Sequence, residues 1–166
     1  DTLTFDRVVI ATGSSPTPLN ASGLDWGRVD SQDYPVKTSN TIMRMPELPR
    51  SLVIVGSGFI AVEFAHVFAS LGVDVTVLAR GNRLLGNHDR DVSDAFTRQF
   101  TKNVNVRFGV EVESVDVADG VSLTLTETGR AQDADTSAVE AQLMLVAVGR
   151  TRSTLSLIHI SEPTRR

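Results

Sequence analysis

The sequence has 166 residues, enough for one domain of ordinary size, and its 41% hydrophobic and 22% charged residues are the shares of an average globular protein. The formal net charge of -4 gives no general attraction to nucleic acid or anionic membranes, and no apolar run approaches the roughly 20 residues of a membrane-spanning helix. The chain has no cysteine, so these residues alone support no thiol, disulfide or thiolate-metal chemistry. It starts with Asp1 and not with methionine, and we therefore expect a piece of a longer protein.

The first fifty residues predict a strand, a turn and then mostly irregular chain. Residues 1–12 predict a strand that runs into a tight turn, since the apolar run 8–10 is short and β-branched and Ala-Thr-Gly over 11–13 ends it. Two prolines argue against regular structure over 14–18. We expect a loop over 20–34 and a short helix over 38–45, and we interpret the whole stretch 16–50 as a connector between domains.

Residues 52–78 predict a strand, a helix and a second strand. Leu-Val-Ile-Val over 52–55 is a continuous apolar run, the pattern of a strand buried on both faces. After a Gly-Ser-Gly break, apolar residues recur at helical spacing in a large stripe (Ile60, Phe64, Val67, Phe68 and Leu71) and a small stripe (Ala61, Ala65 and Ala69). Gly72 ends the helix, and 73–78 is the next strand. This pattern is typical of a βαβ unit, in which a right-handed crossover joins two parallel strands.

Beyond this unit the sequence predicts another helix and several short strands. The helix covers 91–103, with one face formed by Val92, Ala95, Phe96, Gln99 and Phe100. Strands are expected around 104–107, 110–117 and 121–126, followed by a polar excursion over 127–138 and a final apolar strand over 142–148. The predicted fold class is α/β: a Rossmann-like domain with a parallel sheet and helices, plus a three-stranded antiparallel excursion.

The motif Gly56-x-Gly58-x-x-Ala61 lies between the first strand of the unit and its helix. In a dinucleotide-binding turn the first glycine permits the bend, the second lets the backbone approach a pyrophosphate, and the small third residue lets the helix pack closely on the strand. The N–H groups at the start of the helix then attract the anion. The alternative is an ordinary βα turn that contains glycines. The candidate cofactor-binding residues of this turn are Gly56, Ser57, Gly58, Phe59, Ile60 and Ala61.

The end of the second strand favours NADPH over NADH. NAD sites usually carry Asp or Glu there, which accepts hydrogen bonds from the ribose hydroxyls. Here that position is Ala79, and Arg80 and Arg83 follow with guanidinium groups suited to a 2′-phosphate. Asp74 lies at the other end of the strand, about 16 Å away at the rise of a strand. The alternative is that both arginines are plain surface charges.

Three segments resemble the class I FAD-dependent pyridine nucleotide-disulfide oxidoreductases. Residues 4–13 (TFDRVVIATG) resemble the end of the first FAD-domain segment, 56–65 the NADPH fingerprint, and 146–150 (VAVGR) the return into the FAD domain. Within the family, the strings over 55–68 and 80–85 are most similar to the mycothione reductase branch. The resemblance implies that further cofactor-binding residues are Ala11, Thr12 and Gly13 against FAD, Gly149 and Arg150 near both cofactors, and Val112.

The resemblance also implies roles on the helix after the glycine turn. Glu63 would lie near the nicotinamide, with an exposed helix carboxylate as the alternative, and Phe59 would be an aromatic gate over the flavin, with a core aromatic as the alternative. His66 and His88 are expected to be surface or packing residues. The family's redox cysteines, first FAD-binding glycine motif and acid–base histidine lie outside this chain, so we expect no catalytic residue in it.

The resemblance divides the chain into five segments. The expected segments are the C-terminal end of the first FAD-domain segment (1–15), the connector (16–50), the NAD(P)-binding Rossmann domain (51–148), the start of the return to the FAD domain (149–154) and a non-native tail (155–166). The tail resembles the translation of an adapter used in sequencing libraries, with a divergent tail as the alternative, and we assign no function to His159.

The function implied is that of a cytoplasmic flavoprotein, an NADPH:disulfide oxidoreductase that passes a hydride from NADPH to FAD and on to the disulfide of a low-molecular-weight thiol, mycothione by the best resemblance. The whole protein would be a homodimer, and this chain alone would not be catalytically competent. The alternatives are an NADH-dependent enzyme like dihydrolipoamide dehydrogenase or another FAD/NAD(P) oxidoreductase, and a non-catalytic dinucleotide-binding module. An ordinary NAD(P) dehydrogenase would need a catalytic Tyr-Lys pair or a polarising histidine, and the single tyrosine, Tyr34, lies in a predicted loop.

Overall fold

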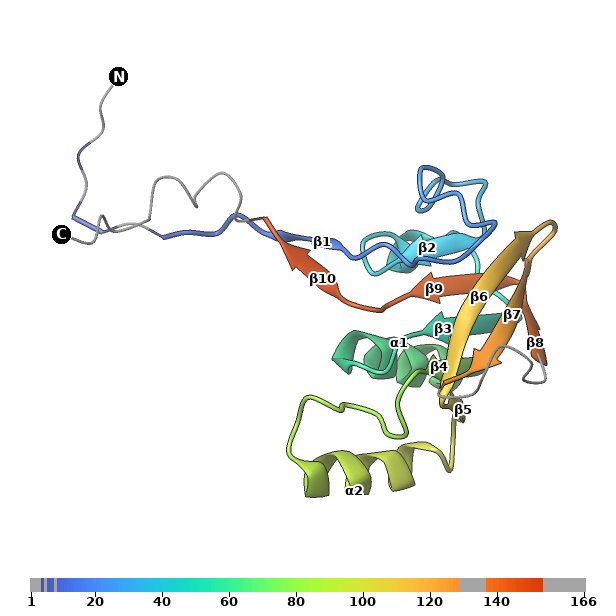
Figure 1. Ribbon diagram of the computed structural model, residues 1–166. Coiled ribbons are helices and arrows are strands. Elements are labelled where there is room, and N and C mark those ends of the chain that lie inside the picture. The colour runs from blue at the N-terminus through green and yellow to red at the C-terminus, as the bar shows by residue number, and fades with distance from the viewer. Residues whose placement is uncertain (1–3, 5, 8, 129–136, 154–166) are drawn as a thin grey trace. The chain divides into compact units, whose positions relative to one another are not determined.

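The computed structural model describes residues 4, 6, 7, 9–128 and 137–153. The chain divides into two compact units, which are described separately (Figure 1). The first unit draws on residues 1–15 and 150–166, and the second on residues 16–149. No helix within the described ranges is long and apolar enough to cross a membrane.

A five-stranded parallel sheet forms the centre of the second unit. Its strands, in spatial order, are β2 (Val36–Thr38), β9 (Leu143–Val146), β3 (Ser51–Val55), β4 (Asp74–Ala79) and β5 (Asn105–Phe108). The chain runs from β3 through β4 to β5 at one edge, and later returns to β9 on the other side of β3. The carboxyl ends of β3 and β9 therefore form a topological switch point, the place where open α/β sheets bind ligands.

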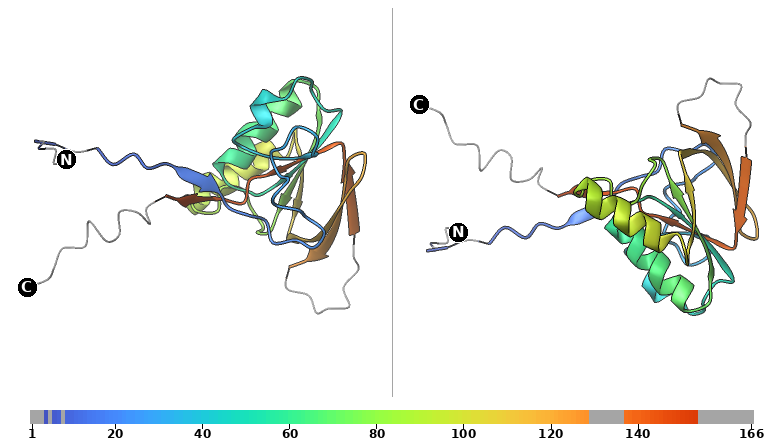
Figure 2. Two further views of the ribbon diagram at one scale, coloured as in Figure 1. Left: turned by 90° about the horizontal axis from the view of Figure 1, so that it is seen from above. Right: turned by 90° about the horizontal axis from the view of Figure 1, so that it is seen from below.

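Two helices cover one face of this sheet. They are α1 (Phe59–Ser70), which connects β3 to β4, and α2 (Arg90–Phe100), which precedes β5, and Figure 2 shows them running together on one side. Leu52 and Ile54 of β3 point to this side and pack with Ala61 of α1, which has no exposed surface. The small stripe predicted on α1 thus lies against the sheet, where it permits a close approach of helix and strand.

The opposite face carries a three-stranded antiparallel sheet. Its strands are β6 (Val110–Val117), β7 (Val121–Glu127) and β8 (Ser137–Ala141), in that order. Val53 and Val55, the residues of β3 that alternate with those under the helices, pack here with Leu123 and Leu125 of β7. Both faces of β3 are buried, which explains its continuous apolar sequence.

The segment 16–50 is part of the second unit. The expected loop over 20–34 is confirmed, with only an isolated bridge at Ser22. The expected helix over 38–45 is reduced to a single 3-10 turn, η1 (Ile42–Arg44), and β2 at the sheet edge was not predicted. The reason is that β2 has three residues, too few for a periodic pattern, and forms through its pairing with β9.

A two-stranded sheet is formed by β1 (Ser14–Pro16), which starts in the first unit and ends at the first residue of the second, and β10 (Arg150–Arg152) of the first unit. The strand predicted over 8–10 is wrong for its described residues, since Val9 and Ile10 are irregular and 88% and 62% exposed. The expectation of no regular structure over 14–18 is also wrong, because Pro16 ends β1, a position that proline tolerates in an edge strand. Residue 8 and the tail 155–166 lie outside the described residues.

The remaining helices and strands follow the predictions within a few residues, with three differences. β5 joins the parallel sheet, whereas β8 supplies the third antiparallel strand from the end of the excursion predicted over 127–138, of which 129–136 lie outside the described residues. On α1, Val67 and Leu71 of the large stripe are 38% and 56% exposed. On α2, Val92 is 56% exposed and Ser93 is fully buried, so the inward face is shifted from the predicted one.

Candidate dinucleotide-binding site

The first element of the site is the turn that follows β3. Gly56 has a φ of 139°, a conformation that residues with a side chain rarely adopt. A Cβ atom at Gly56 would lie 2.3 Å from the carbonyl oxygen of Ala147, just beyond β9. The Gly56 N–H donates to Leu78 of β4 at 3.0 Å, and the Ala147 N–H donates to Val55 at 2.8 Å. The turn therefore sits between the carboxyl ends of β4, β3 and β9, at the switch point of the sheet.

The second glycine faces open space. No atom lies within 4 Å of the position of a Cβ at Gly58, and the residue is exposed. Gly58 is also the N-cap of α1, and no side chain caps the helix there. The first-turn N–H groups of the helix are thus available to an anion, with Ala61 completely buried behind them. The strand, turn, helix and strand context predicted for the motif is confirmed, and this geometry fits a diphosphate.

The second element of the site is the loop over 80–89 that follows β4. Ala79, the last residue of the strand, has no exposed surface, so no carboxylate lies there. The Arg80 side chain is 80% exposed and forms an ion pair with Glu111 at 3.7 Å, and Arg83 is half-buried. Asp74 is the first residue of the strand, at its opposite end, as predicted. An NAD site usually carries a ribose-binding carboxylate at the end of this strand. Here the strand ends at Ala79 instead, and two guanidinium groups follow it, those of Arg80 and Arg83.

Backbone hydrogen bonds hold the turn and the loop together. The N–H of Leu85 donates to the carbonyl of Ser57 at 2.8 Å, which fixes the loop directly to the glycine turn. At the other end of the loop, the Gly109 N–H donates to the Gly81 carbonyl at 3.1 Å. The segment that carries the arginines is therefore adjacent to the segment that would hold the diphosphate.

Other residues of the predicted site lie on or near α1. Phe59 is 60% exposed, so the alternative of a core aromatic is wrong. Ile60 is half-buried, Glu63 is exposed on the helix, and His66 and His88 are exposed as expected. Val112 belongs to the core between the two sheets and is 9% exposed, and its role as a cofactor-binding residue stays a prediction.

The residues predicted to contact FAD lie where the chain enters and leaves the second unit. Ala11, Thr12 and Gly13 are exposed, and Gly13 has a φ of 78°. The Arg150 guanidinium donates to Ser14 through Nε to Oγ at 2.8 Å and through Nη2 to the carbonyl oxygen at 2.6 Å. Gly149, in the second unit, has a φ of 153° and accepts a hydrogen bond from the Thr17 N–H at 3.0 Å. The two segments, far apart in the sequence, are thus brought together by β1 and β10.

The family profile described as pyridine nucleotide-disulphide oxidoreductase matches residues 1–163 of the chain. The chain belongs to this family. The family predicted from residues 4–13, 56–65 and 146–150 is thereby confirmed, as is the mixed α/β fold class.

Named relatives and solved structures of the family agree with this assignment. The chain is 41% identical over 151 residues to mycothione reductase of Mycobacterium tuberculosis, covering 89% of this chain and 29% of the relative. It is 34% identical over 152 residues to dihydrolipoyl dehydrogenase of Halobacterium salinarum, covering 90% and 30%. The crystal structure of LpdA from M. tuberculosis superposes with a TM-score of 0.69 at 27% identity, covering 90% of this chain and 30% of that one. The chain thus spans less than a third of the length of these family members.

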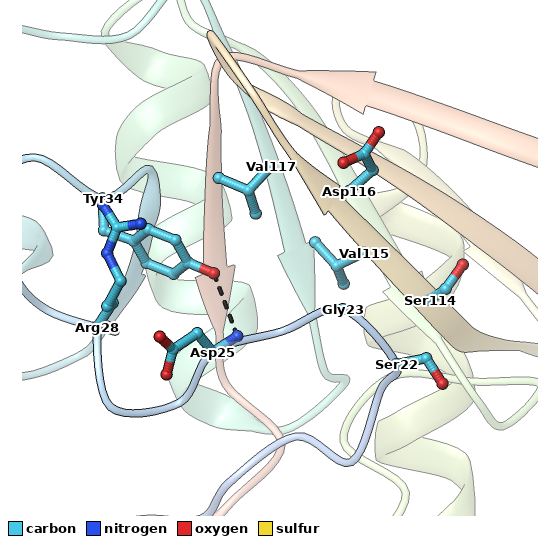
Figure 3. Close-up of a pocket in the computed structure, with 9 residues that line it drawn as sticks. All are labelled: Ser22, Gly23, Asp25, Arg28, Tyr34, Ser114, Val115, Asp116 and Val117. Carbon is cyan, nitrogen blue, oxygen red and sulfur yellow. Dashed lines mark hydrogen bonds between the residues drawn. The ribbon is translucent and has the colours of Figure 1, made fainter.

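Neither of two cavities in the second unit contains a predicted cofactor-binding residue. One, of about 460 Å³, lies between the loop over 22–34 and β6 (Figure 3). It contains the Tyr34 hydroxyl, which accepts a hydrogen bond from the Asp25 N–H at 3.3 Å, and the Arg28 guanidinium, 4.7 Å from the centre of the Tyr34 ring. The other, of about 690 Å³, includes Ser51 and Asp74, the first residues of their strands. The candidate site is an open surface at the carboxyl ends of the strands, distinct from both cavities.

Sequence reasoning missed a carboxylate that organises the segment before η1. Asp30 has a φ of 72°, and its side chain accepts hydrogen bonds from the Thr38 N–H and Oγ1, both at 2.7 Å, and from Thr41 Oγ1. Burial raises the pKa of this carboxyl, but the hydrogen bonds from Thr41 and Thr38 and the charge of Lys37 outweigh burial and hold the pKa below its ordinary value. No local sequence signal distinguishes Asp30 from other polar residues of the loop.

Proposed function

We propose that this chain is the NADPH-binding part of an FAD-dependent disulfide reductase. The observation that carries the proposal is the glycine turn at the switch point, where Gly58 faces open space at the uncapped start of α1. When bound, NADPH and FAD would supply the hydride transfer that reduces a cysteine pair outside this chain and then a disulfide. The chain itself would bind and orient the nucleotide.

Different residues of the second unit would bind different parts of the dinucleotide. The backbone N–H groups at the start of α1 would hold the diphosphate, and Gly58 would let the backbone approach it. Arg80 and Arg83 would bind the 2′-phosphate, which a carboxylate at Ala79 would repel. Exposed Phe59 and Glu63 would lie near the nicotinamide.

We also propose, from the family, an FAD site, a homodimer and a substrate for the whole protein. Ala11, Thr12, Gly13 and Arg150 would form one wall of the FAD site, supported by the pairing of β1 with β10. The whole protein would be a cytoplasmic homodimer that reduces the disulfide of mycothione, and the 41% identity to a mycothione reductase supports this substrate. The second candidate is an NADH-dependent dihydrolipoyl dehydrogenase, supported by the 34% identical relative.

Calorimetric titration of the 166-residue chain with NADPH and with NADH tests the cofactor assignment. We expect NADPH to bind at least ~10-fold more tightly than NADH, since one charge-assisted hydrogen bond to the 2′-phosphate contributes about this much affinity. In the double variant Arg80→Gln/Arg83→Gln this preference should disappear, whereas Arg98→Gln, which removes one positive charge from the exposed side of α2, should leave it intact. Equal or tighter binding of NADH by the unmodified chain would contradict NADPH as the cofactor.

The substrate is tested separately in the full-length protein. Initial rates with mycothione disulfide, glutathione disulfide and dihydrolipoamide under the same conditions distinguish the two candidate functions. We expect turnover of mycothione disulfide with NADPH. Turnover of dihydrolipoamide with NAD⁺ in its place would favour the second candidate.

A further inference from the structure

The loop over 80–89 carries Arg80 and Arg83 and contains no regular structure, yet one of its residues is completely buried. Leu84 has no exposed surface and belongs to the core between α1, α2 and the sheet. Its backbone N–H and carbonyl groups cannot reach water and need partners within the protein. The structure supplies both partners from side chains of α2.

Two hydroxyl groups one helical turn apart hold Leu84. The Leu84 N–H donates to Oγ1 of Thr97 at 3.0 Å, and the Oγ of Ser93 donates to the Leu84 carbonyl. The Thr97 hydroxyl uses its own proton to donate to the Ser93 carbonyl at 2.8 Å. Each hydroxyl therefore has a defined role as donor or acceptor, and Ser93 is itself fully buried. Ser93 and Thr97, at positions i and i+4 of α2, thus satisfy both backbone groups of Leu84, as the backbone of a neighbouring strand would.

The next residue of the loop binds the glycine turn. Leu85 has a φ of 54°, a left-handed conformation that is uncommon for a residue with a side chain. In this conformation its N–H donates to the Ser57 carbonyl at 2.8 Å. The loop is thus held on one side by α2, through Leu84, and on the other side by the glycine turn, through Leu85.

We propose that Ser93 and Thr97 are positioning residues that set the preference for NADPH over NADH. They touch no part of the nucleotide; they fix the loop from which Arg80 and Arg83 would reach the 2′-phosphate. An arginine on a fixed loop loses less conformational entropy on binding, and its planar donors keep the geometry that a phosphate requires. This inference rests on the proposed function and extends it to α2, which contains no residue of the predicted site.

The test measures NADPH and NADH affinity of the 166-residue chain by calorimetry. Thr97→Val replaces the hydroxyl by a methyl of similar size and leaves the Leu84 N–H without its acceptor, and Ser93→Ala removes the donor to the Leu84 carbonyl. Each variant should weaken NADPH binding ~10-fold and NADH binding less than ~2-fold, because only NADPH uses the arginines. Thr97→Ser keeps the hydroxyl and should retain the preference of the unmodified chain.

Thr101→Val is the matched control. The Thr101 hydroxyl makes the same kind of bond to its own helix, to the Thr97 carbonyl at 2.9 Å, but no bond to the loop, so its removal should leave the preference unchanged. Circular dichroism shows whether each variant is folded. If Ser93→Ala does not fold, the NADPH and NADH affinities of Thr97→Val test the inference. An equal loss for both cofactors, or an unchanged preference, overturns the inference and leaves the proposed function standing. If the unmodified chain binds neither nucleotide or prefers NADH, the proposed function fails and the inference with it.

Discussion

The carbonyl oxygen of Ala147 lies 2.3 Å from the position that a Cβ atom on Gly56 would occupy. The two residues follow β3 and β9, strands that are neighbours in the sheet although they are far apart in the sequence. Two separate sequence motifs, the glycine turn after β3 and the Val-Ala-Val-Gly-Arg segment that starts at the last residue of β9, therefore meet at one point. The glycine at 56 is required by this backbone contact, whereas the glycine at 58 borders open space.

The first prediction follows from that difference. Gly56→Ala should lower the free energy of unfolding by at least ~2 kcal/mol, because alanine would have to adopt a φ of 139° and its Cβ would overlap the Ala147 carbonyl. Urea denaturation followed by circular dichroism measures the change. A variant as stable as the unmodified chain would show that the turn moves freely away from β9.

The second prediction concerns binding at the neighbouring glycine. Gly58→Ala should change the free energy of unfolding by less than ~1 kcal/mol, since a Cβ there meets no atom within 4 Å and the backbone is extended. It should nevertheless weaken NADPH and NADH alike by ~10-fold or more, because the methyl group would occupy the space of the diphosphate. Calorimetric titration measures both affinities. Loss of stability without loss of binding would contradict the assignment of this turn.

The central βαβ unit could be predicted from the sequence because it depends on local patterns. The run over 52–55 is buried on both faces, so every residue is apolar, and the glycine motif marks the change to a helix. The strands β1 and β2 could not be predicted, since each has three residues and forms only by pairing with a strand near the other end of the chain.

A side-chain hydrogen bond to the backbone explains the wrong inner face predicted for α2. The apolar pattern predicted that Val92 lies on the inner face of α2, but the buried residue is Ser93. The Ser93 hydroxyl donates a hydrogen bond to the Leu84 carbonyl, in a loop whose backbone pairs with no strand at that point. The glycine turn could be located because its chemistry is local. The contacts of Leu84 with α2 and of Leu85 with Ser57 join separate segments and have no sequence signature.

The third prediction concerns the ion pair between Arg80 and Glu111. The two side chains are 80% and 52% exposed and 3.7 Å apart, so the carboxylate competes with a 2′-phosphate for the guanidinium. Glu111→Gln should therefore tighten NADPH binding by up to ~5-fold, the range of an exposed ion pair, and leave NADH binding unchanged. The gain should shrink at high salt, where exposed charges are screened. Glu113→Gln, two residues further along β6, is the matched control, and an equal gain there would mean that only net charge matters.

The fourth prediction concerns the pH dependence of stability at Asp30. Its pKa lies below the ordinary value of 3.8, despite burial, because Thr41 and Thr38 donate hydrogen bonds to the carboxylate. The stabilisation is therefore complete above that value and is lost as the pH falls through the lower pKa of the folded state. Asp30→Asn should cost ~1–3 kcal/mol at neutral pH and make stability less dependent on pH below about 5. Asparagine tolerates the left-handed conformation of this residue, so the loss reports on the carboxylate and not on the backbone.

The control for this experiment is a second carboxyl group of the same loop. The backbone N–H of Asp33 and the Ser31 hydroxyl lower the pKa of the Asp33 carboxyl too, but the residue is exposed and solvent screens its interactions. Asp33→Asn should thus change the slope of stability against pH less than Asp30→Asn does. Urea denaturation at a series of pH values measures both slopes. Equal slopes in the two variants would mean that the bonds from Thr38 and Thr41 to the Asp30 carboxylate stabilise the fold no more than a surface contact does.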